Sequence, residues 1–237
     1  MRDKEPVMSP TEEELVRLSR RIPGNTLPKN NTKAQTAAET AISQVKILVF
    51  EWDGSEYLFR YMVDGRQVQP VSGDEQKTTF DALLRSSAVS TKLLLIANYG
   101  DAFTTLPAIG ASEGAVRRDI ACSFSQSSST FPMFGEIAIP GGLDAGSNNN
   151  FSATMLRAVA KVEVVKTLEA DSYGFEIASI AIYRHNTKVQ LSPDVANMAA
   201  LPDLGVAGPS VPSHSSLSSV PVSVSAGEDG SISPLYI

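Results

Sequence analysis

Few residues of this chain could carry out catalytic or metal chemistry, and they stand far apart. The two histidines, His185 and His214, have no third ligand near them at the spacing of a zinc site. The single cysteine, Cys122, is preceded by an alanine and followed by Ser123 and Phe124, which is typical of a small buried residue. A nucleophilic thiolate needs a partner base, and the histidines are poorly placed to supply one. The sequence therefore predicts no metal, no cofactor and no thiol chemistry.

Serines are so numerous in this chain that chance groupings with histidine and aspartate are expected. The glycine-rich segments lack the Lys-Ser/Thr ending of a phosphate-binding loop. Asp53, Asp64 and Asp101 each adjoin a glycine, as residues of tight turns do. Although a Ser-His-Asp triad can form from residues far apart in the sequence, we predict that the protein is not an enzyme and has no catalytic residues.

Length and composition are typical of a soluble acidic protein with a proper core. The 237 residues are 42% hydrophobic and 19% charged, with a net charge of −6 and a pI near 5.0. This charge argues against a nucleic-acid partner. One cysteine excludes an internal disulfide. No apolar run is long enough to span a membrane, and the residues after Met1 do not resemble a signal peptide.

Period-two patterns predict most of the elements as β-strands. Residues 45–52 are apolar on both faces, as in a strand in the middle of a packed structure. A tight turn at Asp53-Gly54 then leads into a partner strand at residues 57–63. Further strands are expected at 92–99, 136–139, 155–166, 175–184 and, if a sheet edge receives it, 219–226.

Residues 15–22 also alternate. Val16, Leu18 and Ile22 share one face, whereas Arg17, Ser19 and Arg21 occupy the other. Arg20 interrupts the apolar face, which favours an edge strand over a central one.

Short helices are expected at residues 36–44 and 79–87, with one helical turn near 115–120. Many strands and two or three short helices predict an all-β fold, a β-sandwich of about seven strands. We expect a mobile arm at residues 1–14, the sandwich at 15–190, and a stretch at 191–237 that is too rich in serine and proline to sustain a core by itself.

Several short elements follow one another in an order that resembles the fimbrillin family, the type V pilus subunits of Bacteroidales bacteria. They are a strand closed by Ile22-Pro23-Gly24, a segment with Glu39 leading to a strand that ends at Asp53-Gly54, a strand ending in Ala97-Asn98, the Pro-Met-x-Gly element at Phe131–Gly135, the Arg-x-Val-Ala-Lys-Val strand at Arg157–Val162, and a strand at 175–183. Phe134 stands where smaller residues are usual in the family.

The resemblance implies a Greek-key, transthyretin-like N-terminal domain that belongs to a pilus at the outer membrane and supports adhesion. It also implies assembly by donor-strand exchange, in which a protease removes the first strand and a C-terminal strand of another subunit replaces it. The candidate displaced strand contains Leu15, Val16, Leu18 and Ile22. The candidate positions for an Arg- or Lys-directed protease are Arg17, Arg20, Arg21, Lys29 and Lys33.

The chain also departs from the family. Its members are lipoproteins with a signal peptide and a lipobox cysteine, and this sequence shows neither feature. The members also carry a second β-sandwich domain. We therefore expect residues 191–237 to be a linker or the start of that C-terminal domain.

An alternative from the residues alone is a stand-alone surface β-sandwich that binds a glycan or a host protein. Tyr57, Phe59 and Tyr61 share a parity and could form a strip that stacks on sugars, although such strips are more often core.

Overall fold

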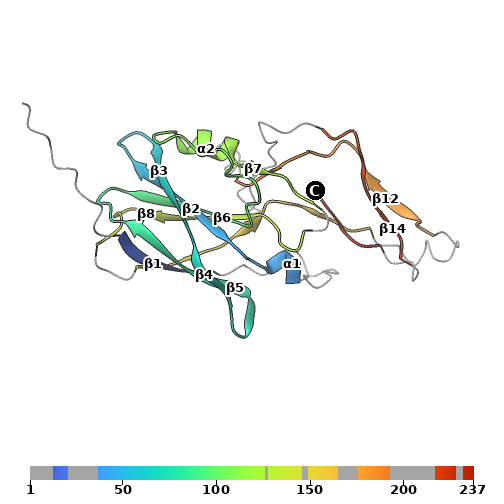
Figure 1. The fold of residues 1–237 in the computed structure, drawn as a ribbon, viewed down its shortest axis with the longest axis horizontal. Coiled ribbons are helices and arrows are strands. Elements are labelled where there is room, and N and C mark those ends of the chain that lie inside the picture. Colours follow the sequence, from blue (N-terminus) through green and yellow to red (C-terminus); the bar gives the residue numbers. More distant parts are fainter. Residues whose placement is uncertain are drawn as a thin grey trace, which may run out of the picture.

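Two β-sheets face each other across a hydrophobic interior in this computed structural model (Figure 1). The structure describes the backbone of residues 13–20 and, in addition, residues 37–125, 128–145, 149–164, 176–192, 217–227 and 232–237. One sheet has the strand order β4-β5-β1-β9, and the other has the order β10-β8-β6-β2-β3. This arrangement confirms the predicted all-β sandwich.

The strands of the two sheets are β1 (Glu13–Arg20), β2 (Val45–Trp52), β3 (Tyr57–Asp64), β4 (Arg66–Val71), β5 (Asp74–Arg85), β6 (Thr91–Ala97), β8 (Met133–Ile139), β9 (Asn149–Ala153) and β10 (Leu156–Arg157). Shorter strands pair around them: β7 (Ala121–Cys122) with β13 (Val189–Gln190), β11 (Lys161–Val162) with β15 (Leu235–Tyr236), and β12 (Ser179–Ile182) with β14 (Val222–Ser225). The helices of the described residues are α1 (Ala37–Thr40) and α2 (Glu113–Asp119).

The five-stranded sheet is buried on both of its faces. One set of β2 and β6 side chains, which includes Val49 and Leu95, packs toward the four-stranded sheet in a hydrophobic cluster that we call the interior cluster. The alternate set, which includes Leu48 and Leu94, packs on the opposite face of the five-stranded sheet in a second hydrophobic cluster, which we call the outer cluster. The prediction that residues 45–52 form a central strand is therefore confirmed. Their continuous apolar run is the signature of this two-sided burial.

Helix α2 covers the outer cluster. Ser112 caps the helix by accepting a hydrogen bond from the backbone N–H of Ala115 on its side-chain oxygen. Val116 and Ile120 are buried against the sheet, together with Cys122. The helical turn predicted near residues 115–120 is thus confirmed, and it forms a third layer on the sandwich.

A β-bulge divides the predicted aromatic strip between two faces. The β2–β3 hairpin forms as expected, with the Asp53 carboxylate accepting hydrogen bonds from the turn. However, Val49 pairs with Tyr61 and the next residue of β2 pairs with Phe59, so Arg60 is the extra residue. Phe59 packs in the outer cluster, whereas Tyr61 packs against the interior cluster. The prediction of one aromatic face is wrong, because the bulge reverses the parity.

The helix predicted at residues 79–87 is wrong, because these residues belong largely to β5. The spacing of Phe80, Leu83 and Leu84 suits a helical face, but Phe80, Ala82 and Leu84 are the residues buried in the interior. Pairing with β4 on one side and β1 on the other determines the strand. Local spacing cannot report such partners, which come from distant parts of the chain. The helix predicted at 36–44 is confirmed in a shorter form, as α1.

The prediction of an edge strand at residues 15–22 is also wrong. Strand β1 lies between β5 and β9 and pairs with both. A charged residue in an otherwise apolar pattern suggested an edge, but the position of a strand depends on which partners are available.

The long strand predicted at residues 155–166 is interrupted. Bends at Ala158 and Val159 separate β10, which pairs with β8, from β11, which pairs with β15. The alternating pattern marks extended backbone correctly, but the chain changes its partner within the segment. Arg157 and Lys161 consequently come close to the chain end at Tyr236.

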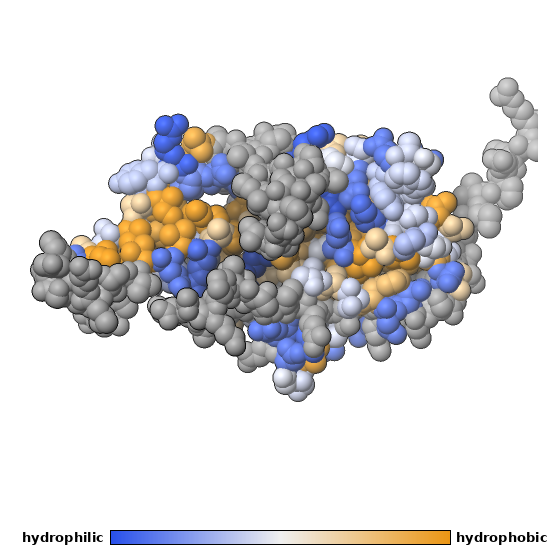
Figure 2. Space-filling view, turned by 180° about the vertical axis from the view of Figure 1, so that it is seen from behind, coloured by the Kyte–Doolittle hydropathy of each residue, from blue (hydrophilic) through white to orange (hydrophobic). Residues whose placement is uncertain are grey.

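The strand expected at 219–226 forms as β14 and pairs with β12 at the end of the molecule away from β1 (Figure 1). Four aliphatic side chains of this ribbon are half-buried and face one side: Ile180, Ile182, Val222 and Val224. Seen from behind, hydrophobic atoms gather at this end (Figure 2). Val220, two residues before β14, is 68% exposed.

Two-sided burial of the central sheet predicts that a truncation on its outer face is as costly as one in the interior. Replacing the fully buried Leu48 by alanine (Leu48→Ala) should lower the free energy of unfolding by about 2–5 kcal/mol. Urea denaturation measures this loss. The control Val89→Ala, at a position 44% exposed, should change it by less than about 0.5 kcal/mol. Similar small effects of both variants would contradict the three-layer arrangement.

Candidate functional site

Strand β1 lies inside the four-stranded sheet, with an antiparallel neighbour on one side and a parallel neighbour on the other. It pairs antiparallel with β5, from Glu13 opposite Arg85 to Ser19 opposite Thr79. It pairs parallel with β9, ending with Arg20 opposite Ala153. Strands β5 and β9 are therefore neighbours of β1 and not of each other. We call the position of β1, bounded by these two strands, the β1 slot.

One side of the β1 slot faces the interior cluster. Residues directly opposite each other on paired strands lie on the same face of a sheet. Phe80, Ala82 and Leu84 of β5 are buried in the interior cluster, and they stand opposite positions 18, 16 and 14 of β1. Val16 and Leu18 thus occupy interior positions of the slot.

The structure divides the candidate strand and protease positions into two groups. Leu15, Val16, Leu18, Arg17 and Arg20 belong to β1. The backbone is paired on both sides at residues 16–19, whereas Leu15 pairs only with β5 and Arg20 only with β9. The other candidates, Ile22, Arg21, Lys29 and Lys33, lie outside the described residues, in the stretch between β1 and α1.

Glu39 of α1 is the centre of a buried polar cluster. Its side chain is 2% exposed. One carboxylate oxygen accepts a hydrogen bond from Arg157 at 2.6 Å. The other accepts from the Tyr236 hydroxyl at 2.8 Å and pairs with Lys161 at 3.0 Å. The cluster joins α1, β10, β11 and β15 at one point, so that segments from both ends of the described chain are tied together.

The charges of the cluster are compensated. Burial raises the pKa of Glu39, but hydrogen bonds from Lys161, Tyr236 and Arg157 outweigh this effect, so the pKa lies below its usual value. Burial lowers the pKa of Lys161, and its bonds to Glu163 and Glu39 reverse the change, so that pKa lies above its usual value. Both shifts favour the ion pair over the neutral forms.

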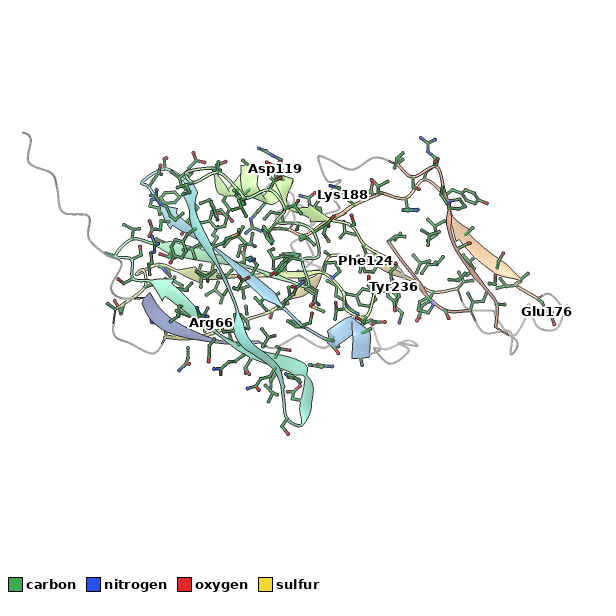
Figure 3. All side chains as sticks on the ribbon, in the orientation of Figure 1. Arg66, Asp119, Phe124, Glu176, Lys188 and Tyr236 are labelled. Carbon is green, nitrogen blue, oxygen red and sulfur yellow. The ribbon has the colours of Figure 1, made fainter. Side chains whose placement is uncertain are left out.

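Aromatic rings and backbone bonds extend the cluster toward the end of β15. The Phe131 ring lies between Phe124, with centroids 5.4 Å apart, and Tyr236, with centroids 4.5 Å apart. Figure 3 shows Phe124 and Tyr236 close together in the middle of the molecule. Ala160 and Ile237 exchange two backbone hydrogen bonds, and Leu235 is 1% exposed. Strand β15 is thus held by packing as well as by charge.

Asn98 performs a similar task at the end of β6. It has a φ of 52°, in the left-handed region that asparagine tolerates better than most residues. Its amide nitrogen donates to the carbonyls of Ala41 and Phe131, at 2.9 and 2.7 Å. Its amide oxygen accepts from the backbone N–H and the hydroxyl of Ser43. This one side chain connects three segments.

Gly135 allows β8 to approach the chain before β10. A Cβ atom there would lie 2.7 Å from the carbonyl oxygen of Thr154, which no side chain can accommodate without a backbone shift.

Glu39, Asn98, Gly135, Arg157 and Lys161 all belong to the motifs that the sequence analysis quoted separately. The structure brings Glu39, Arg157 and Lys161 into direct contact. Sequence reasoning missed this convergence, and it missed Tyr236. The one available sequence signal for this contact was charge, because Glu39 is acidic and Arg157 and Lys161 are basic. Opposite charges alone do not identify which residues pair.

Arg117 was also missed. It belongs to α2, is fully buried, and donates to Glu113 at 2.7 and 2.9 Å and to the Ser192 hydroxyl at 2.8 Å. It forms a further ion pair with Glu136. These bonds attach the chain after β13 to α2 and to β8, a positioning role within the fold.

Cys122 is a free cysteine and is buried. Burial and the neighbouring Asp101 carboxylate raise the pKa of the Cys122 thiol to about 12, which leaves it unreactive. Within the described residues, Nδ1 of His185 lies 2.9 Å from the backbone carbonyl oxygen of Asn186. His214 lies outside the described residues. No group of three or more potential metal ligands is found in the described ranges. None of the described helices is long and apolar enough to cross a membrane.

Comparison with known sequences identifies the family. The family model for the fimbrillin-A associated anchor proteins Mfa1 and Mfa2 matches residues 15–202, well over half of the chain. The chain belongs to this family. The match contains the β1 slot and most of the Glu39 cluster, and it confirms the resemblance on which the sequence analysis relied.

A solved structure shows the same fold. The crystal structure of a proposed cell adhesion protein from Parabacteroides distasonis is similar with a TM-score of 0.58 and 15% sequence identity. The alignment covers 95% of this chain and 66% of that protein, so the chain spans just under two thirds of its length. At this identity the likeness shows the fold alone. No curated protein matches the chain.

The Glu39 cluster predicts a pH-dependent stability. Because the pKa of Glu39 is lowered in the folded state, its contribution is present above its usual value of 4.5 and is lost as the pH falls through the folded value. Glu39→Gln should lower the free energy of unfolding by about 3 kcal/mol at pH 7, since it breaks a buried ion pair. The difference from the unmodified protein should shrink below pH 4.5.

Denaturant unfolding at a series of pH values measures this difference. The matched control is Asp64→Asn, which removes an exposed carboxylate from its pair with Lys46 and should cost less than about 1 kcal/mol. A loss for Glu39→Gln that is equal at pH 3 and pH 7 would show that the charge of Glu39 does not matter.

Proposed function

We propose that this chain is a structural subunit of a bacterial surface pilus that binds other pilus subunits by strand exchange at the β1 slot and supports adhesion. The observation that carries the proposal is the place of β1 between β5 and β9. Membership of the fimbrillin-A associated anchor family supports the pilus and adhesion role. As the resemblance implies, we place the pilus at the outer membrane of the cell surface.

Loss of β1 would leave the rest of the described chain, which we call the body, with a site that favours the binding of another strand. Both flanking strands would then present unpaired N–H and C=O groups along one edge, and the interior residues Phe80, Ala82 and Leu84 would lose their cover. An incoming extended segment would restore main-chain hydrogen bonds, each of about 0.5–1.5 kcal/mol, and would bury apolar surface again.

A single cut between β1 and α1 would free β1 from the body. Strand β1 is joined to the described remainder of the chain only through residues 21–36. A protease binds its substrate as an unpaired extended segment, but the backbone is paired on both sides at Arg17 and is paired with β9 at Arg20. We therefore favour Arg21, Lys29 and Lys33 among the candidate positions.

The Glu39 cluster suits such a scheme. Helix α1 begins directly after the stretch in which the cut is proposed, and Glu39 attaches α1 to Arg157, Lys161 and Tyr236. The new chain end would stay bound to the body while β1 leaves. The cluster would thereby confine the change to the slot.

We propose a β-sandwich domain at residues 15–190, which β1 extends to Glu13, and a stretch at 191–237 that leads toward a further β domain. The described strands of this stretch, β14 and β15, pair with β12 and β11 of the β-sandwich domain. Support comes from the β12–β14 ribbon, whose half-buried aliphatic face suits contact with additional β-structure. Exposed Val220 and Leu217 flank the start of this ribbon.

A second candidate function is a stand-alone module that binds a glycan. Trp52, at the end of β2, is 40% exposed, and its ring lies 5.2 Å from the ring of Tyr57. An exposed indole is a suitable platform for stacking on a sugar. No second stacking surface is formed by the divided aromatic strip, which makes this the weaker proposal.

Limited trypsin digestion tests the strand-exchange proposal. The first cuts should fall between β1 and α1, and gel filtration in mild denaturant should then separate the β1 peptide from the body. The trimmed body should bind a fluorescent peptide of residues 13–22, measured by anisotropy, because the slot is empty. Such binding should be absent in the uncut protein.

The matched control replaces Arg21, Lys29 and Lys33 by glutamine, which should prevent both the cut and the peptide binding. A folded, trimmed body that binds no strand peptide would contradict the proposal. A reproducible hit on a glycan array that Trp52→Ala abolishes would then favour the glycan-binding module.

A further inference from the structure

The β1 slot has four consecutive interior positions. Positions 14, 16 and 18 stand opposite Leu84, Ala82 and Phe80 of β5. Positions 18 and 20 stand opposite Phe151 and Ala153 of β9. Apart from Asn149, which stands opposite position 16 on β9, the partner residues of this face belong to the interior cluster or pack against it.

The two middle positions have a partner on each side, and each outer position has one partner, on β5 for position 14 and on β9 for position 20. The aliphatic and aromatic partners from the interior cluster are buried. Leu84 and Ala82 are fully buried, Phe80 is 4% exposed and Ala153 is 7% exposed. Apolar side chains at such positions gain the free energy of burial. A charged residue there has to lose its hydration or bend away from the interior, and either outcome weakens the fit of the strand.

Strand β1 matches only half of this pattern. Its sequence places Val16 and Leu18 at the two middle positions but Glu14 and Arg20 at the two outer ones. At the alternate positions, Arg17 and Ser19 are polar and stand opposite Asp81 and Thr79, whereas Leu15 is apolar and stands opposite Leu83. The alternation of the strand is therefore correct for the slot from Val16 to Ser19, while its two ends are not.

We infer that the β1 slot is specific for an extended segment of seven residues with apolar side chains at its first, third, fifth and seventh positions, and that β1 is a weakly fitting placeholder for it. This inference rests on the proposed function and deepens it, because it gives the chemistry of the partner strand. It also gives strand exchange a direction, since a partner that fills all four positions displaces β1 and is not displaced by it.

Side-chain size adds a second element of specificity. The small residues Ala82 and Ala153 stand opposite positions 16 and 20, so the slot has most room beside them. A large aliphatic residue at the position of Arg20 is the change that improves the fit most. Strand direction, in contrast, is not selected by the backbone. Strands β5 and β9 run in opposite directions relative to β1, so a strand of either polarity has one parallel and one antiparallel neighbour.

Peptide competition on the trimmed body tests the inference. Three synthetic peptides of residues 13–22 are compared by fluorescence anisotropy: the natural sequence, the variant Glu14→Val with Arg20→Leu, and the control Ser19→Val on the outer face. The double variant should bind at least about tenfold more tightly than the natural peptide, as expected for burial of two aliphatic side chains. The control should bind within about threefold of the natural peptide.

The same substitutions in the uncut chain give a second measurement. Glu14→Val with Arg20→Leu should raise the melting temperature by roughly 2–4 °C or more and should slow the loss of β1 after the cut.

The outcomes separate the two levels of the proposal. If the double variant and the natural peptide bind equally, or the natural peptide binds more tightly, the inferred specificity is wrong while strand exchange stands. If the trimmed body is folded and binds none of the three peptides, the strand-exchange function itself is wrong. If the control gains as much as the double variant, general hydrophobicity and not the interior register determines binding, and the inference is again overturned.

Discussion

Every backbone N–H and C=O group inside a sheet needs a hydrogen-bond partner. In this molecule the structure depends most on that requirement at β1. Strands β5 and β9 cannot satisfy each other, because β1 stands between them and pairs with both. The four-stranded sheet is continuous only while some extended segment occupies that position. Nothing in this requirement demands that the segment be covalently part of the chain, and this freedom links the architecture to assembly.

A strand can be exchanged only if the rest of the fold remains in place. The five-stranded sheet meets this need, because it is covered on both faces and its outer layer is secured by the buried Arg117. The Glu39 cluster also keeps part of the fold in place. It attaches α1, which follows the segment of the proposed cut, to β11 and β15. These contacts hold together parts of the protein other than the slot itself.

The buried polar groups of the described residues connect distant segments of the chain. The Cys122 thiol is buried with a raised pKa, and the buried ionic groups that are present, such as Glu39 and Arg117, are fully engaged in holding segments together. Buried charge serves here to select one arrangement of distant segments, since each partner would be costly to leave unpaired.

Sequence alone determined the parts of the structure that depend on local alternation. The two-sided apolar run of β2, the Asp53 turn and the valine-serine alternation of β14 are patterns within one segment, and each formed as expected. The order of short motifs was also sufficient to indicate the family. Tertiary structure decided which segments become neighbours: that residues 79–85 form a strand, that β1 is central, that a bulge separates Phe59 from Tyr61, and that Glu39 meets Tyr236. The physical reason is that strand pairing and ion pairing are made between residues far apart in the chain, and a sequence pattern records the needs of each segment without naming the partner that meets them.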